Sequence, residues 1–173
     1  PVPAGSENNM VSNFDEGRVA AAYGMWIAAN DTMNGGKSNS KLEVIEPGAA
    51  GTKSAMQVSG ELVAGGAFVF AGALFSPGSA PMRPVNLSKK SGISFWAKGD
   101  GQTYTLLVLT EARSGQSGEP PAMTSFTAGP DWKQYSFPFS TFETDGSDIS
   151  GIGFIRAQEP GKFQFAIDEV EIK

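Results

Sequence analysis

The sequence predicts an all-β protein, a two-sheet β-sandwich or jelly roll, and three observations support this. Apolar and polar residues alternate with a period of two in most segments, whereas the 3.6-residue period of an amphipathic helix is nearly absent. Gly and Pro together make up 33 of the 173 residues, which favours turns. Roughly ten short apolar segments separated by such turns fit a sandwich and argue against a helix bundle or a doubly wound sheet.

Four strands are expected in the first half of the chain. The first ends at an Asp-Glu-Gly turn, the second ends at Pro47-Gly48, and the third places Met56 and Val58 on one face. The fourth is continuously apolar and rich in small residues, so it is expected to be buried on both faces or to line a concavity. These strands are expected over residues 10–14, 41–46, 54–61 and 65–75.

Six further strands are expected in the second half. The first of them places Ile93, Phe95 and Ala97 on one face, and the Gly-Asp-Gly sequence that follows it predicts a tight turn. Pro138 lacks an amide hydrogen and is therefore expected at a sheet edge or a bulge. The expected ranges are 92–98, 104–110, 123–127, 132–139, 151–156 and 163–172.

A single domain is expected over residues 10–173, and residues 1–9 are expected to be a linker or a trimmed terminus. No internal repeat or change of composition indicates a second domain. The one helical candidate, residues 15–23, is expected to be a single turn or a loop. The absence of Cys fits a periplasmic or secreted protein as well as a cytosolic one.

Composition also limits the chemistry. The formal charge of −5 argues against a nucleic acid partner, which requires clustered Lys and Arg. No apolar run is long enough for a membrane span. With neither Cys nor His, the chain has no thiol nucleophile, no imidazole base and no thiolate or imidazole zinc site. Carboxylate, Lys, Tyr and oxygen-ligand metal chemistry remain. Nearly all candidate carboxylates lie beside Gly, Pro or Ser in turns, so intrinsic catalysis is not expected.

Residues 26–42 contain an ordered motif that resembles the signature of the complex I intermediate-associated protein family. In that family a Trp precedes Asn-Asp, a Met-Gly-Gly turn and a Ser-x-Ser sequence that enters a strand. Here Asn34 is inserted before the glycines. Later segments that resemble the family are GGAFVFAG, SGISFWAKGDGQTY, WKQYSFPFSTF, SGIGF and GKFQFAIDEVEI. The residues that match the motif are Trp26, Asn30, Asp31, Met33, Gly35, Gly36, Ser38 and Ser40.

The resemblance extends over nearly the whole chain, from about Asn13 to Ile172. It implies a galactose-binding-like jelly roll, similar to family 11 carbohydrate-binding modules, with a concave sheet that presents a ligand groove. The family occurs alone as an assembly factor and fused to larger proteins, including amidohydrolase-like enzymes. Its glucan-binding relatives use several Tyr along the groove, whereas this chain has three Tyr in total.

Two candidate ligand-binding groups are expected. In the NDTMNGGKSNS loop, Asp31 and Asn34 either contact a ligand or hold a turn through side-chain hydrogen bonds. Trp26 before it is either a platform for a sugar ring or a core residue. The second group is less local in the sequence and consists of Trp96, Tyr104 and Arg156. Strand alternation points Trp96 away from the core, toward a ligand, a partner or solvent.

The acidic residues near the two ends of the chain suggest a structural calcium ion. In the related family an Ile-Asp pair in the last strand lies near the N-terminal strand, which here implies that Asp168 lies near Asp15 or Glu16. Ca²⁺ prefers six to eight oxygen ligands, and these carboxylates would supply some of them. The alternative is that Asp168 accepts backbone hydrogen bonds from the first loop.

The expected function is that of a non-catalytic accessory module. Its partner is expected to be a carbohydrate or a protein. A protein partner can be a catalytic domain of the same, longer polypeptide. The alternative is a protein–protein assembly factor. A carbohydrate-binding module predicts a polar groove, whereas an assembly factor predicts an exposed apolar patch.

Overall fold

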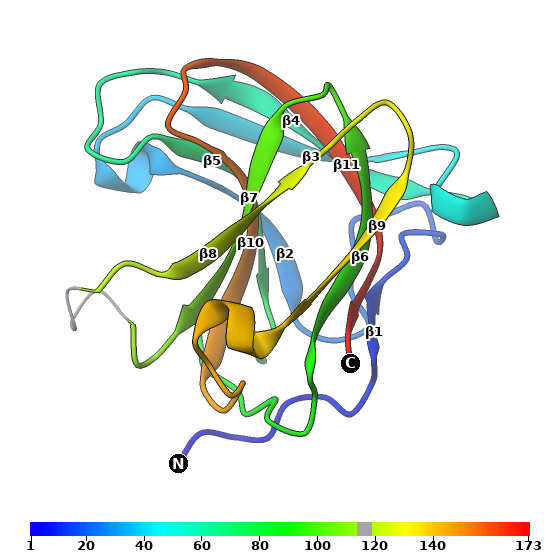
Figure 1. Ribbon diagram of the computed structural model, residues 1–173, viewed down its shortest axis with the longest axis vertical. Coiled ribbons are helices and arrows are strands. Elements are labelled where there is room, and N and C mark those ends of the chain that lie inside the picture. The colour runs from blue at the N-terminus through cyan, green and yellow to red at the C-terminus, as the bar shows by residue number, and fades with distance from the viewer. Residues whose placement is uncertain (114–118) are drawn as a thin grey trace.

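The computed structural model describes residues 1–113 and 119–173, which form a sandwich of two antiparallel β-sheets (Figure 1). The all-β jelly-roll prediction is therefore confirmed. Three short 3-10 helices, η1 (Asp31–Asn34), η2 (Ala49–Gly51) and η3 (Phe139–Phe142), lie in the connections. None of the described helices is long and apolar enough to cross a membrane.

The six-stranded sheet has the order β3-β4-β11-β6-β9, and β1 also pairs with β11. The long strand β11 pairs with β4 along its first half and with β1 near its end, and its pairing with β6 has a register irregularity between Asp168 and Glu171. The strands are β1 (Met10–Ser12), β3 (Asn39–Ile45), β4 (Ala55–Leu62), β6 (Gly92–Gly99), β9 (Lys133–Pro138) and β11 (Gly161–Ile172).

The five-stranded sheet has the order β2-β5-β10-β7-β8, with β10 at its centre. Its strands pair antiparallel from one edge to the other, with one register irregularity between Ile149 and Gly151 in the pairing of β10 with β7. They are β2 (Met25–Asn30), β5 (Phe70–Ser76), β7 (Thr103–Thr110), β8 (Ala122–Thr127) and β10 (Ile149–Ala157).

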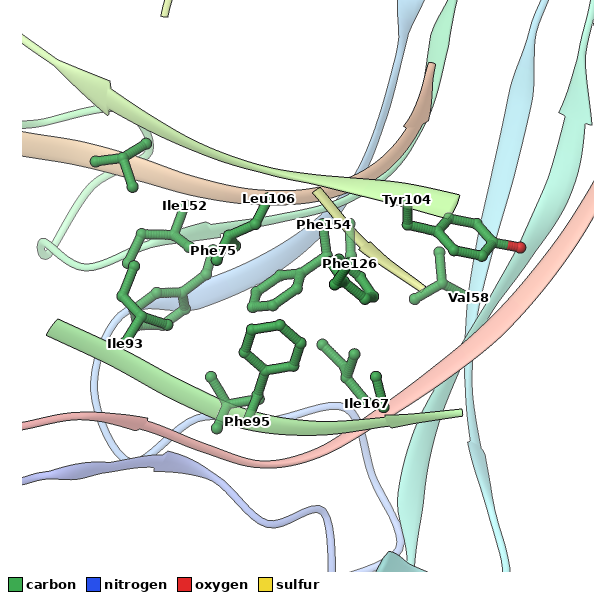
Figure 2. Close-up of a cluster of buried hydrophobic side chains, with 14 of the residues drawn as sticks. Val58, Phe75, Ile93, Phe95, Tyr104, Leu106, Phe126, Ile152, Phe154 and Ile167 are labelled. Atoms are coloured by element: carbon green, nitrogen blue, oxygen red, sulfur yellow. The ribbon is translucent and has the colours of Figure 1, made fainter. Parts of the chain in front are cut away.

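The core fills the space between the two sheets and is rich in aromatic side chains (Figure 2). Phe95 of β6 and Phe154 of β10 meet edge to face from opposite sheets, with ring centroids 5.0 Å apart. Phe126 of β8 packs against both rings. Inward-facing side chains alternate with outward-facing ones along each strand, as the period of two predicts.

Most expected strands are present, and the differences have local causes. Strand β2 was not expected, since its Met-Trp-Ile-Ala-Ala sequence lacks a polar alternation. The strand expected at 65–75 begins only at Phe70, after a loop in which Gly65 has a positive φ. Residues 15–23 form turns and bends, which fits the loop alternative. Pro138 ends the edge strand β9, as predicted.

The first residues of the chain lie against the domain. Amide hydrogen bonds join Gly5 to the Asn86 carbonyl and Asn86 to the Pro3 carbonyl, at 2.8 and 2.7 Å. The Ile172 amide donates to the Asn9 carbonyl at 2.8 Å. Residues 3–5 therefore lie beside Asn86, and Asn9 lies beside the end of β11.

Candidate functional site

An apolar groove of about 660 Å³ lies on the outer face of the five-stranded sheet. One row of side chains crosses the sheet beneath it, because the strand registers place these residues directly opposite one another. The row contains Ile27, Leu74, Gly153, Leu107 and Met123, one from each strand. The groove therefore spans the full width of the sheet.

Two glycines of the central strand lie next to leucine side chains of the groove. Gly151 and Gly153 are two residues apart on β10, so both face outward. A Cβ at Gly153 would lie 3.0 Å from the Leu107 side chain, and one at Gly151 would lie 3.1 Å from that of Leu74. The Leu107 and Leu74 side chains therefore lie close over the backbone of β10 at these two positions.

All five exposed large hydrophobic side chains of the described residues line this groove. They are Ile27, Met33, Phe68, Met82 and Met123. No charged side chain lines it among the residues that the structure describes. An exposed apolar patch concentrated at one place is typical of an interaction site, whereas scattered apolar residues are ordinary.

Few polar groups are available in the groove. Asn30 and Thr32 lie at its edge, but the Asn30 side-chain oxygen already accepts hydrogen bonds from the Thr32 amide and hydroxyl, at 3.0 and 2.6 Å. The three Tyr of the chain lie elsewhere, in or against the core. The groove thus has neither a Tyr platform nor a set of fixed polar groups for sugar hydroxyls.

The loop that carries Met33 is held by a buried aspartate. Asp31 is 1% exposed, and its carboxylate accepts hydrogen bonds from the Ser38 amide at 3.0 Å, the Ser38 hydroxyl at 2.8 Å and the Phe70 amide at 3.3 Å. A Cβ at Gly36 would lie 2.2 Å from this carboxylate, which explains the glycine. The turn alternative for Asp31 is therefore the one that the structure supports.

The other residues expected near this loop do not line the groove. Trp26 packs against the core through Phe14, Phe75 and Phe154, and its indole N–H donates to the Ser12 hydroxyl at 2.9 Å. It is a core residue, as its alternative predicted. Asn34 is exposed at the end of η1, outside the residues that form the groove.

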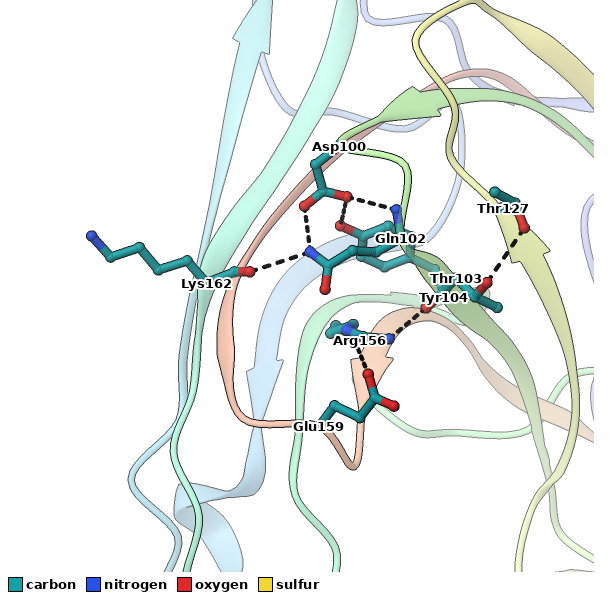
Figure 3. Close-up of polar contacts among 8 residues, drawn as sticks. All are labelled: Asp100, Gln102, Thr103, Tyr104, Thr127, Arg156, Glu159 and Lys162. Atoms are coloured by element: carbon teal, nitrogen blue, oxygen red, sulfur yellow. Dashed lines mark hydrogen bonds and ion pairs between the residues drawn. The ribbon is translucent and has the colours of Figure 1, made fainter.

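Tyr104 and Arg156 belong to a polar cluster that closes the β6–β7 turn (Figure 3). Tyr104 is fully buried, and its hydroxyl donates to Asp100 at 2.8 Å. Burial raises the pKa of Tyr104, and the Asp100 carboxylate adds to that shift. Arg156 donates to the Thr103 carbonyl at 2.8 Å and pairs with Glu159 at 2.6 Å. The structure thus places the Tyr104 ring in the core and its hydroxyl in this cluster, and a ligand-binding role for Tyr104 stays a prediction.

Trp96 lies on the opposite side of the molecule from the groove. It faces outward from the six-stranded sheet, in register with Gln134 on one side and Asp168 on the other. Nearby, the Lys98 ammonium lies 5.2 Å from the centroid of the Trp132 ring. The predicted outward direction of Trp96 is correct, but the structure does not bring it together with Asp31 or Asn34.

The structure brings Asp15 near Asp168 but places Glu16 elsewhere. Asp168 is fully buried, and it accepts hydrogen bonds from the Ala49 amide at 2.8 Å and the Thr52 hydroxyl at 2.6 Å. Glu16 instead pairs with Arg18 at the surface. The predicted backbone acceptor role of Asp168 thus exists, with donors from the η2 loop rather than from the first loop.

Burial raises the pKa of Asp168, and the Asp15 charge adds to that shift despite hydrogen bonds that lower it. The folded protein therefore holds this proton more tightly than the unfolded chain, whose Asp pKa is about 3.9. The stabilising contribution is present at acidic pH and is lost as the pH rises from about 4 through the raised pKa.

This loss is expected to lower the melting temperature of the unaltered chain as the pH rises above about 4. Asp168→Asn removes the titrating group and is expected to make the melting temperature fall less over the same pH range. Curves of melting temperature against pH that run parallel for the two proteins would contradict this prediction.

The structural calcium ion stays a prediction. The described residues contain no group of three or more acidic side chains placed to hold a metal, and three donors already occupy the Asp168 carboxylate. Melting curves with Ca²⁺ and with a chelator test it directly. A melting curve that neither added Ca²⁺ nor the chelator changes would contradict the calcium prediction.

Sequence reasoning missed the residues that form the groove. The concavity expected for residues 65–75 was the nearest prediction, and Phe70 and Leu74 of β5 do line the groove. A second signal was the spacing of Gly151 and Gly153, which places two absent side chains on one face. Strand β2, which supplies Ile27, gave no such signal.

Comparisons with known proteins agree with this architecture. The family model described as Complex I intermediate-associated protein 30 (CIA30) matches residues 13–167. A comparison with curated protein sequences gave no significant match.

Several solved structures share the fold. The family 11 carbohydrate-binding module of the cellulosomal cellulase Lic26A-Cel5E of Clostridium thermocellum is similar with a TM-score of 0.66 and 18% identity, over 98% of this chain and 95% of that one. The family 11 module of the same organism in complex with a β-1,3-1,4-mixed-linked tetrasaccharide gives 0.65 and 18%, with the same coverage. A family 30 module of a Clostridium thermocellum cellulase gives 0.57 and 16%, over 80% of this chain and 90% of that one.

The family match covers far more than half of the chain and includes the loop that Asp31 holds beside the groove. The chain shares the fold of a carbohydrate-binding module, and the lining of its groove is apolar. The chain therefore belongs to the complex I intermediate-associated protein 30 family.

Proposed function

We propose that this chain is a non-catalytic binding module that holds an apolar segment of a partner protein in the groove on its five-stranded sheet. The observation that carries the proposal is that every exposed large hydrophobic side chain of the described residues lines this one groove. Such a surface is stabilised when a partner covers it.

The chemistry of the groove favours aliphatic, methionine or aromatic side chains of a partner. Removing one such side chain from water contributes roughly 1.5–3 kcal/mol. Met33, Met82 and Met123 add flexible, polarizable contacts that adapt to different partners. An assembly-factor role, in which the module holds a partner protein, fits this lining.

A carbohydrate is the weaker candidate for this groove. Each sugar hydroxyl that is buried without a hydrogen-bond partner costs about 1–3 kcal/mol. The groove offers no charged residue among the described ones, and the Asn30 oxygen is already occupied. The carbohydrate-binding modules share the fold of this chain at low sequence identity, and a shared fold does not determine which ligand is bound.

Photo-crosslinking tests the proposal directly. A benzoylphenylalanine placed at Met123, on the groove, is expected to capture a specific protein in lysate of the source organism. The same group at Gln134, an exposed residue on the edge strand of the other sheet, is the matched control. Capture counts as support once the purified partner binds this chain in isolation.

Met123→Lys is expected to weaken binding of that purified partner by at least roughly tenfold, because it places a charge in an apolar interface. Gln134→Lys adds the same charge on the opposite face and is expected to leave the affinity unchanged. Two results would contradict the proposal. In the first, mixed-linked β-glucan raises the melting temperature of the chain and Met123→Lys abolishes that rise. In the second, both variants bind the protein partner as tightly as the unaltered chain.

Fusion to an amidohydrolase-like catalytic domain is a separate part of the proposal. It is supported by the family resemblance, in which such fusions occur. Reading the coding sequence upstream of Pro1 tests it, and a frame without a catalytic domain on either side would contradict it.

A further inference from the structure

Methionines are distributed unevenly in this protein. The chain has six, and the three that are most exposed, Met33, Met82 and Met123, all line the apolar groove. Met56 is fully buried in the core. The remaining two are Met10 and Met25, which are half-buried and lie outside the groove. The exposed thioethers are therefore concentrated at the proposed binding site.

The backbone is arranged to display these side chains. Met82 has a φ of 60°, a conformation that is unfavourable for a residue with a side chain, and its side chain is 46% exposed. The Ser76 hydroxyl, itself buried, accepts a hydrogen bond from the Met82 amide at 3.3 Å. Met33 is 85% exposed on the η1 loop that buried Asp31 holds in place.

We propose that Met33, Met82 and Met123 form a reversible oxidation site that controls whether the groove binds its partner. The inference rests on the proposed function. Each thioether sulfur attacks one oxygen of hydrogen peroxide, so that an S–O bond forms, the O–O bond breaks and water leaves. The sulfur loses two electrons and the peroxide gains them. A methionine sulfoxide reductase supplied with a dithiol reverses the change: the dithiol gives up two electrons and becomes a disulfide, and the sulfoxide oxygen leaves as water.

Oxidation changes the character of the groove without changing the core. A sulfoxide is polar and accepts hydrogen bonds, whereas the described lining offers few polar groups and no charged one. An apolar partner would leave these new oxygens without hydrogen-bond partners, which disfavours the complex. The buried Met56 is protected from the oxidant, so the fold is retained.

The experiment uses the full chain and Nile red, a neutral apolar dye, as the probe. After mild hydrogen peroxide treatment, peptide mass spectrometry is expected to find sulfoxide at Met33, Met82 and Met123 at least roughly tenfold sooner than at Met56. Nile red affinity is expected to fall by roughly tenfold or more while the circular dichroism spectrum and melting temperature stay unchanged. Treatment with methionine sulfoxide reductases is expected to restore the affinity.

A triple variant, Met33→Leu, Met82→Leu and Met123→Leu, is the control. Leucine is similar in volume to methionine and is not branched at Cβ, so the φ of residue 82 adds no new strain. The readout for this variant is the ratio of its Nile red affinity after peroxide to its own affinity before, and that ratio is expected to stay near one. Sulfoxide that forms first at Met10 or Met25, or undiminished binding by the oxidised wild-type chain, would overturn the oxidation site alone. Untreated protein that binds no Nile red would overturn the groove proposal as well.

Discussion

Replacing Phe154 with alanine is expected to lower the free energy of unfolding by about 3–5 kcal/mol. Phe154 is fully buried at the centre of the five-stranded sheet, where its ring meets Phe95 edge to face and also packs on Trp26 and Phe126. The surrounding rings come from both sheets, so they cannot all move to fill the cavity. Urea unfolding monitored by circular dichroism measures the loss.

Phe154→Leu is the control for this prediction, since it keeps most of the buried volume. It is expected to lose clearly less stability than Phe154→Ala. A loss below about 1 kcal/mol for Phe154→Ala would contradict the account, because that value is typical of an average substitution and not of a central core residue.

Asp31→Ala is expected to lower the free energy of unfolding by roughly 3 kcal/mol, since it leaves the Ser38 and Phe70 amides without their acceptor in a buried place. It is also expected to weaken partner binding, because the η1 loop that presents Met33 loses its anchor. Thermal unfolding and the partner affinity measure the two effects.

Asn34→Ala provides the comparison within the same loop. Asn34 is exposed, and substitutions of this kind usually change stability by less than about 0.5 kcal/mol. If Asp31→Ala and Asn34→Ala had equal effects, the buried carboxylate would not be what holds the loop.

The fold was largely predictable from the sequence, because a period of two and frequent Gly and Pro constrain a chain to short strands. The burial of Phe95 and Ala97 and the edge position of Pro138 follow from that pattern alone. Strand β2 was missed because both of its faces are apolar or small, so that no alternation marks it.

The binding surface was predictable only in part. Aromatic and charged residues were predicted as ligand contacts. Trp26 and Tyr104 instead pack inward, and Trp96 faces away from the groove. The groove instead depends on strand registers that bring five distant segments into one row, and a single sequence does not reveal registers.

The most direct test of the central claim is the affinity of the purified partner for Gly153→Leu. The added side chain displaces that of Leu107, since its Cβ alone would lie 3.0 Å from Leu107, and it stays apolar, so it changes the shape of the groove and keeps its hydrophobic character. If the groove holds the partner, the affinity falls by at least roughly tenfold while the chain remains folded. An affinity equal to that of the unaltered chain would show that the partner binds elsewhere.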